Sequence, residues 1–212
     1  MKARRLPRAF YARPTLEVLA EIIGKVLVHD TAGGRASGVI VEAEAYIGED
    51  DPACHAAPGP TRRNAPLYGR PGHAYVYLNY GLHALMNAVT EAAGSPAAIL
   101  IRALEPCEGI DLMRERRQKG SRLGARGSRF GQERSRVSID DDRLCRGPGN
   151  LTVAMGIGLG DNMLDLTRSH LRIEDRGIAP PALSYSPRIG IRVGTDKRWR
   201  CCWKGHKGLS GT

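Results

Sequence analysis

The chain has 212 residues, of which 42% are hydrophobic and 25% are charged, and its formal net charge is +10. This composition excludes global disorder and supplies enough apolar residues for one domain with a core. No apolar run approaches the roughly 18 residues that span a membrane, and no apolar segment follows the basic N-terminus as in a secretory signal. The excess of positive charge favours a polyanionic partner, nucleic acid first and an anionic membrane surface second.

The first predicted element is a helix over residues 14–24, where apolar residues recur at helical spacing. Thr15 is the expected N-cap and Gly24 the expected stop. A strand over 25–30 follows, and the glycines of residues 32–34 predict a turn.

Residues 39–46 alternate as a strand does. One face is small and apolar, and the other carries two carboxylates and a phenol: Ile40, Glu42, Glu44 and Tyr46. Burying Glu44 among small apolar residues costs free energy unless a partner offsets it, and such costs usually mark function. We expect Arg102, between apolar residues of a predicted strand over 97–104, to be that partner. The acidic loop 49–51 is expected to be solvated.

A β-hairpin is predicted from two strands, 74–79 and 83–89, around a turn near Tyr80 and Gly81. Tyr75 and Tyr77 share one face, which is typical of a half-buried hairpin or of a surface on which bases stack. Tyr80 departs from their alternation and is expected to project outward at the turn.

The charge is concentrated in residues 114–136, which hold eight Arg and one Lys against two Glu. We expect a short helix that ends near Arg117 and then a flexible basic loop over about 118–136. The loop is either a mobile arm for phosphates or a solvated insertion.

The remaining predicted elements are a helix over 150–157 and closing strands over 188–193 and 198–203. Few helices and adjacent strands predict an α+β fold, a single domain over 1–212 with a curved, mostly antiparallel β-sheet, peripheral helices and a protruding β-hairpin.

The acidic constellation around Glu42 and Glu44 leaves three interpretations open: a divalent-metal site of a nuclease, one activated carboxylate beside an aromatic pocket, or an acidic cap on a strand. No phosphate-binding P-loop, HExxH or GxSxG motif is present. The five cysteines are odd in number and form no CxxC, which fits a reducing compartment. Cys201, Cys202 and His206 lack a further ligand pair, so we expect no structural zinc there.

Six segments in a fixed order then identify a resemblance. They are GVIVEAEAY (38–46), DPACH (51–55), PGHAYVYLNYG (71–81), IRALEP (101–106), GPGNL (147–151) and PRIGI (187–191). Together they resemble the alkyladenine (3-methyladenine) DNA glycosylase family over residues 10–203. The resemblance implies a monofunctional glycosylase that flips damaged purines out of duplex DNA and hydrolyses the N-glycosidic bond, leaving an abasic site for base excision repair.

The resemblance also implies roles for single residues. Glu44 matches the general base that activates water, and Arg102 and the Ile189 carbonyl match groups that position that water. The base pocket corresponds to Tyr46, His55, Tyr77 and Asn87. The wedge that fills the vacated stack corresponds to Tyr80, with Leu82 and His83 beside it. The expected DNA-backbone contacts are Arg62, Arg63, Asn64, Gly149 and Asn150.

The family reaction needs no metal and no cofactor, and no lysine in these motifs is placed for a lyase step. The expected partner is double-stranded DNA containing damaged purines, bound by a monomer in the cytoplasm at the nucleoid. Lesion preference stays open, because the chain departs from the family pattern at Arg62, Asn79, His83, Asn150 and Cys201. The alternatives are a non-catalytic nucleic-acid-binding protein and a metal-dependent nuclease.

Overall fold

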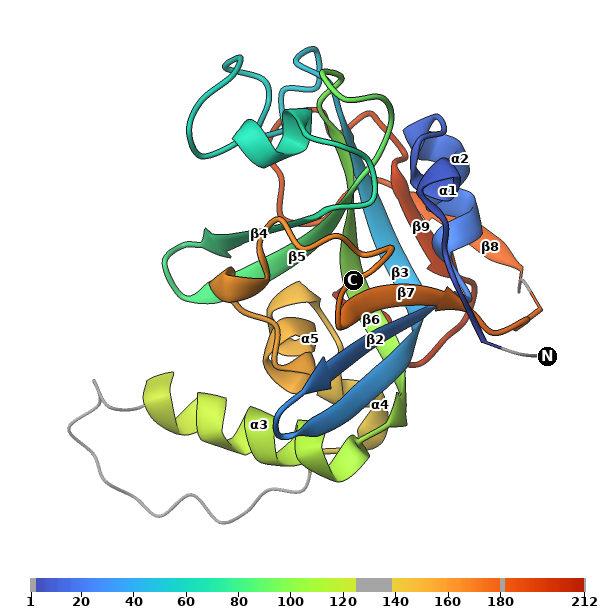
Figure 1. Cartoon of the computed structure of the whole chain (residues 1–212), viewed down its shortest axis with the longest axis vertical. Helices are drawn as coiled ribbons and strands as arrows, with labels where there is room; N and C mark the ends of the chain where they lie inside the picture. The colour runs from blue at the N-terminus through green and yellow to red at the C-terminus, as the bar shows by residue number, and fades with distance from the viewer. Residues whose placement is uncertain (1–2, 125–138, 180–181, 212) are drawn as a thin grey trace.

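The computed structural model describes residues 3–124, 139–179 and 182–211 (Figure 1). Its framework is an open nine-stranded sheet in which all the paired strands are antiparallel. The strands are β1 Arg4–Arg5, β2 Val26–Thr31, β3 Gly34–Ile47, β4 Ala74–Asn79, β5 His83–Val89, β6 Ala97–Glu108, β7 Leu171–Asp175, β8 Leu183–Ser186 and β9 Arg200–Trp203. The main path runs β1-β7-β2-β3-β6-β5-β4, and β9 joins β3 to β8. The α+β fold with an antiparallel sheet is therefore confirmed.

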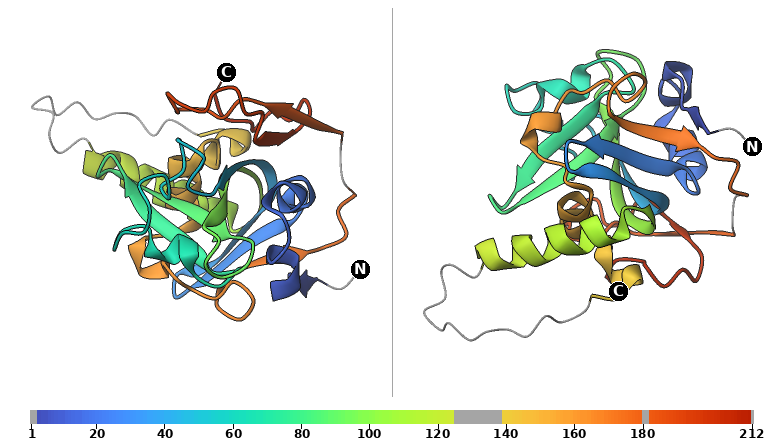
Figure 2. Two further views of the ribbon diagram at one scale, coloured as in Figure 1. Left: turned by 90° about the horizontal axis from the view of Figure 1, so that it is seen from above. Right: turned by 60° about the horizontal axis from the view of Figure 1, so that its bottom comes forward.

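Helices surround this sheet. They are α1 Arg8–Tyr11, α2 Thr15–Ile22, α3 Ile110–Gly124, α4 Asp141–Leu144 and α5 Pro148–Met155, with 3₁₀ turns η1 Ala65–Tyr68 and η3 Leu159–Asp161. α3, α4 and α5 lie together across one end of the sheet, and the long loop between β3 and β4 lies at the other end, as Figure 1 and the right-hand view of Figure 2 show. None of the described helices is long and apolar enough to cross a membrane.

A β-bulge in β3 sets which side chains face the core. Pairing with β6 passes from Ile40 to Glu42, so Val41 is an extra residue in this strand. Ile40 and Ala43 consequently pack in the same core, although strict alternation would place them on opposite faces. The bulge leaves Glu42 and Glu44 together on the other face, toward Arg102.

The β4–β5 hairpin has the predicted strand bounds. Its turn places Tyr80 at φ 49° and Gly81 at φ 68°, and the Leu82 amide donates to the Asn79 carbonyl. Three residues thus connect the paired Asn79 and His83. Two successive positive φ angles suit the right-handed twist of the strands, but a positive φ is costly for a tyrosine. The hairpin projects beyond the rest of the sheet (Figure 1).

Four local predictions were wrong. Thr15 is not the N-cap of α2: Pro14 holds that position, and the Thr15 hydroxyl bonds Thr90 and Glu91 instead. α3 continues through Gly124 rather than ending near Arg117, so only 125–136 of the predicted basic loop remains, and it lies outside the described residues. Residues 188–193 form bends rather than a strand. The acidic loop 49–51 is not wholly solvated, because Asp51 is buried.

Candidate active site

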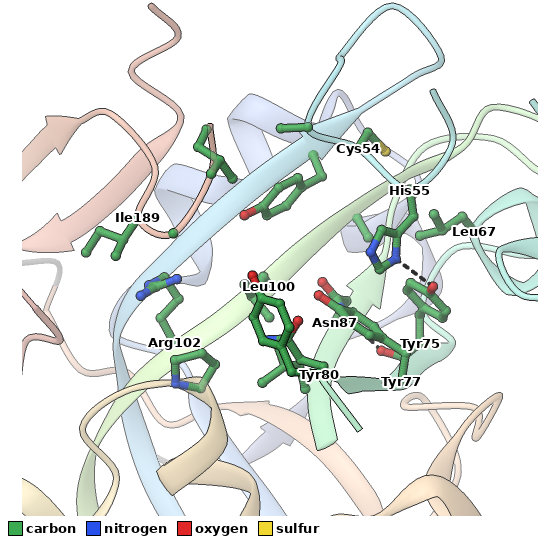
Figure 3. A pocket seen from close by; sticks show the side chains of 18 residues that line it. Cys54, His55, Leu67, Tyr75, Tyr77, Tyr80, Asn87, Leu100, Arg102 and Ile189 are labelled. Carbon is green, nitrogen blue, oxygen red and sulfur yellow. Dashed lines mark hydrogen bonds between the residues drawn. The ribbon is translucent and has the colours of Figure 1, made fainter. Parts of the chain in front are cut away.

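A cavity of about 380 Å³ opens between the β4–β5 hairpin, the 53–55 loop, β6 and the 189–191 loop (Figure 3). Seven of the predicted site residues line it: Tyr46, His55, Tyr77, Tyr80, Asn87, Arg102 and Ile189. They come from segments far apart in the chain. Arg102 and Ile189 lie at one end of the cavity, whereas His55, Tyr75 and Tyr77 lie at the other.

Glu44 lies directly behind the wall of this cavity and is fully buried. Its Oε2 accepts from Arg102 at 3.1 Å and from the Tyr46 hydroxyl at 2.9 Å, and its Oε1 accepts from the Ile189 amide at 2.7 Å. All three donors line the cavity, but Glu44 itself does not. The structure thus brings Glu44, Arg102 and Ile189 together, with the amide rather than the carbonyl of Ile189 on the carboxylate.

The environment of Glu44 favours proton uptake. Burial raises the pKa of its carboxyl above the usual range, while Arg102, the Ile189 amide and the Tyr46 hydroxyl oppose that rise. Burial disfavours the charged form of a carboxyl, so burial dominates here. A carboxylate with a raised pKa is a stronger general base than an exposed one.

Glu42, the second carboxylate of β3, is fixed by partners that the sequence analysis missed. Its Oε1 accepts from Arg102 at 2.8 Å, from Arg200 at 2.8 Å and from the Ser210 hydroxyl at 2.8 Å. The Ser210 amide donates to Oε2 at 2.6 Å. We call Glu42, Glu44, Arg102, Arg200 and Ser210 the charged cluster. Its two carboxylates are paired with arginines, which does not fit the metal-dependent nuclease interpretation.

Asp51 and Arg188 form a second buried pair beside the cavity. Asp51 accepts from both terminal nitrogens of Arg188, at 2.5 and 2.7 Å, and neither side chain is exposed. Burial alone would raise the pKa of Asp51, but the bonds from Arg188 lower it overall. The Arg188 guanidinium also lies over the ring of Tyr46, 4.6 Å from its centroid. This pair therefore supports Tyr46 from behind, a role that no local signal in an acidic loop indicates.

The aromatic end of the cavity is built from His55, Tyr75 and Tyr77. His55 Nδ1 lies 2.9 Å from the Tyr75 hydroxyl, and its ring centroid is 4.5 Å from that of Tyr77 (Figure 3). Burial, with a smaller effect of Arg63, lowers the pKa of His55, so the imidazole is neutral near pH 7. Asn87 is buried, and its amide donates to the Tyr75 carbonyl at 3.0 Å. The result is a neutral, electron-rich surface.

Asn64 corrects one predicted DNA contact. It is buried, and its amide donates to the carbonyls of His55 at 2.7 Å and Gly59 at 2.9 Å. Asn64 therefore holds the loop that carries His55, and its side chain has no surface left for a phosphate.

The other predicted contact residues are accessible. Tyr80 is 87% exposed and Leu82 is 77% exposed, at the tip of the hairpin, and His83 is exposed beside them. Gly149 packs against His83 so closely that a Cβ would lie 3.0 Å from the imidazole. The remaining three, Arg62, Arg63 and Asn150, are exposed. All the predicted wedge and DNA-backbone residues except Asn64 are therefore accessible to a large ligand such as DNA.

Cys201, where the chain departs from the family pattern, faces the core rather than the cavity. Cys201 is buried in the main core, where it pairs with Ala43 across β3 and β9. Burial raises the pKa of Cys201 to about 11 and that of Cys202 to about 12, so both thiols are protonated near neutral pH.

Comparisons with known proteins agree with this geometry. Residues 9–207 match the model of the family described as methylpurine-DNA glycosylase (MPG). A protein of Burkholderia lata is 45% identical over 97% of this chain and 91% of its own length. Relatives from Chlorobium phaeobacteroides and Methanocella arvoryzae are 44% and 45% identical, each over 92% of this chain and 90% of their own. All three carry the name "Putative 3-methyladenine DNA glycosylase".

Proposed function

The chain belongs to the methylpurine-DNA glycosylase family, and on that premise we propose that it removes damaged purines from duplex DNA with Glu44 as the general base. It is a DNA glycosylase, a hydrolase of N-glycosidic bonds. The observation that carries the proposed mechanism is the position of Glu44, buried behind one end of a cavity whose other end is aromatic.

In the proposed reaction, Glu44 accepts a proton from water as the water oxygen attacks C1′ of the flipped nucleotide. The N-glycosidic bond breaks through an oxocarbenium-like state, which a nearby carboxylate stabilises, and its electron pair leaves with the base. Arg102 keeps the unprotonated carboxylate in place, since its guanidinium bridges Glu44 and Glu42.

Water reaches Glu44 through the segment of residues 189–191. A carboxylate oxygen accepts more than one hydrogen bond, so Oε1 can take a water beside the Ile189 amide. Gly190 has a φ of 78° and lies in a bend, which makes a small movement of this wall inexpensive. Such a movement would open the carboxylate to the cavity.

The aromatic end favours positively charged bases. A purine alkylated at a ring nitrogen carries positive charge, which tyrosine faces attract and a neutral His55 does not repel. The same charge makes the base a good leaving group, since it departs neutral. Neutral lesions such as hypoxanthine lack both advantages and depend on shape and on contacts such as that of Asn87. We therefore propose 3-methyladenine-type bases as the preferred substrates, with 7-methylguanine, hypoxanthine and ethenoadenine following.

The exposed hairpin tip is the proposed wedge. Extrusion of a nucleotide costs a few kcal/mol, and a side chain that occupies the vacated stack offsets part of it. Tyr80 has the exposure and the flat surface for this, and Leu82 lies beside it. Arg62, Arg63, Gly149 and Asn150 are the proposed backbone contacts around the lesion.

A single-turnover comparison tests the mechanism. Base release from duplexes that contain 3-methyladenine or hypoxanthine is measured in EDTA for the wild type, Glu44→Gln and Glu49→Gln. Glu49 is a matched control, because it is an exposed glutamate that bonds Tyr68. Glu44→Gln should slow release by about 10²- to 10⁴-fold, the usual contribution of a general base, with duplex binding retained. Release by Glu44→Gln at the wild-type rate, or no release by the wild type, would refute the proposal.

A further inference from the structure

A second group of polar side chains lies outside the cavity, in a shallow surface hollow that β2, η3 and the segment before β7 enclose. His29, Asp161 and His170 each direct one ligand-type atom into this hollow, and these atoms all lie within 4.8 Å of one another. His29 Nε2 is 3.7 Å from Asp161 Oδ1, and His170 Nε2 is 3.6 Å from the same oxygen.

These distances are too long for hydrogen bonds between nitrogen and oxygen, which are about 2.7–3.2 Å. They are close to the separation of two ligands on one tetrahedral metal ion. With metal–ligand bonds of about 2.0–2.1 Å, adjacent ligand atoms lie about 3.3 Å apart. Each histidine nitrogen therefore needs a shift of a few tenths of an ångström relative to Asp161, and the two nitrogens, which lie within 4.8 Å of each other, close by rotation of the exposed His170.

The outer contacts of the three side chains leave the ligand atoms available. His29 is buried, and its other ring nitrogen, Nδ1, lies 3.0 Å from the Met155 carbonyl. A carbonyl only accepts, so Nδ1 carries the proton and Nε2 keeps its lone pair. Asp161 Oδ2 accepts from the Gly158 amide at 2.8 Å, which leaves Oδ1 facing the two imidazoles.

The charges around the hollow do not compete for these atoms. Asp30 lines the hollow, but Arg35 and Arg172 already bond it at 2.6 Å each. The Arg116 guanidinium, whose charge acts on His29, donates to the Ala154 carbonyl and the Thr31 hydroxyl. His170 is half exposed, so an ion can enter from solvent.

We propose that His29, Asp161 and His170 bind a divalent transition-metal ion of the zinc class, with solvent as the fourth ligand. Two imidazoles and one carboxylate suit zinc, and the proton on His29 Nδ1 is held in the way that orients metal-bound histidines. The ion joins β2, η3 and the segment before β7. η3 leads directly into Asn162, whose side chain accepts from the Val76 amide of β4 at 3.0 Å, so the site stiffens the support of the hairpin.

The test uses the full chain, stripped with EDTA and then titrated with zinc chloride or cobalt chloride. Calorimetry should give one zinc per chain, and cobalt should give the visible absorption of a tetrahedral nitrogen–oxygen site without a thiolate charge-transfer band. His170→Ala removes a ligand from an exposed position, and Asp161→Asn keeps an oxygen for the Gly158 amide. Each substitution should weaken zinc binding by more than about 100-fold. Loss of a residue that only bonds a metal ligand costs roughly 10- to 100-fold.

His206→Ala is the matched control, since His206 also pairs with a carboxylate, Glu105 at 3.5 Å, but lies outside the hollow, with its ring against Trp203 of β9. It should bind zinc like the wild type, and zinc should raise the Tm of both but not that of His170→Ala. Equal binding by the wild type and His170→Ala, loss of binding in His206→Ala, or no binding by the wild type would each overturn the site. None of these outcomes depends on base release, so the proposed glycosylase mechanism stands or falls separately.

Discussion

The charged cluster and the tip of the hairpin are built on opposite principles. At the charged cluster, Glu42, Glu44 and Arg102 are buried and find their partners within the protein. At the hairpin tip, Tyr80 and Leu82 are exposed, and Tyr80 has a φ that is costly for its side chain. Contacts inside the fold account for the first group, whereas we propose that DNA outside the protein accounts for the second.

Removal of Arg102 should give the largest difference in stability between the charged cluster and the hairpin tip. Arg102→Met leaves two buried carboxylates without their shared cation, which should lower the free energy of unfolding by about 3–5 kcal/mol. Tyr80→Ala, at the hairpin tip, should change the free energy of unfolding by less than about 0.5 kcal/mol. Urea denaturation of both variants measures the contrast. Similar free energies of unfolding for the two variants would mean that the charged cluster does not stabilise the fold.

The pH dependence of base release should depend on Glu44 of the charged cluster and not on the hairpin tip. Protonated Glu44 cannot accept a proton, and burial raises its pKa, so the rate should fall about tenfold per pH unit below a midpoint that lies above the 4.5 usual for glutamate. Tyr80→Ala should lower the rate at every pH and leave this midpoint in place. Single-turnover rates between pH 4 and 8, with circular dichroism to check the fold, test this. A midpoint at or below 4.5 would show that burial does not control Glu44.

Tyr80→Ala should act on DNA rather than on the protein. Loss of a stacking side chain costs about 1–3 kcal/mol of binding free energy, and we expect this loss for a lesion in duplex DNA. Binding to the same lesion in a single strand should change less, because no stack has to be filled. Fluorescence anisotropy with both substrates makes the comparison, and equal losses would contradict the wedge role.

The smallest effect belongs to Ser210→Ala. Glu42 loses the hydroxyl donor but keeps the Ser210 amide, Arg102 and Arg200, so the expected destabilisation is about 1–2 kcal/mol. If Ser210 also positions Arg102, base release should slow while duplex binding stays constant. Ser186→Ala is a suitable control, since the Ser186 hydroxyl accepts from Arg200 and donates to the Pro187 carbonyl rather than to Glu42. No change in either stability or rate would remove Ser210 from the cluster.

Local patterns predicted the hairpin bounds and the strands that carry Glu44 and Arg102 well, because alternation and turn residues are local signals. The end of α3 was misjudged because Gly120 is not a stop. Its missing side chain allows close contact with Val153 of α5, where a Cβ would lie 3.0 Å away. Such an approach depends on another helix and leaves no trace in the neighbouring residues.

The errors in predicting the site also come from contacts between segments that are far apart in the sequence. Asp51 lies in an acidic loop, and its cationic partner, Arg188, comes 137 positions later in the chain. Ile189 and Ile191 alternate as in a strand, but the backbone there bends so that the Ile189 amide meets Glu44. Neither partner can be recognised before the fold brings the segments together. The motifs that indicated the family contain both residues without indicating what they contact.

The bond between Ser210 and Glu42 joins positions 168 residues apart. A ribosome has therefore made all nine strands of the sheet before this donor of the charged cluster exists. Until then, a nascent chain would have to keep Glu42 hydrated or leave it short of donors inside a forming core, and both delay closure of β3 against β9. Chains that stop short of Ser210 should then open more readily than the full chain and be cut faster in limited proteolysis.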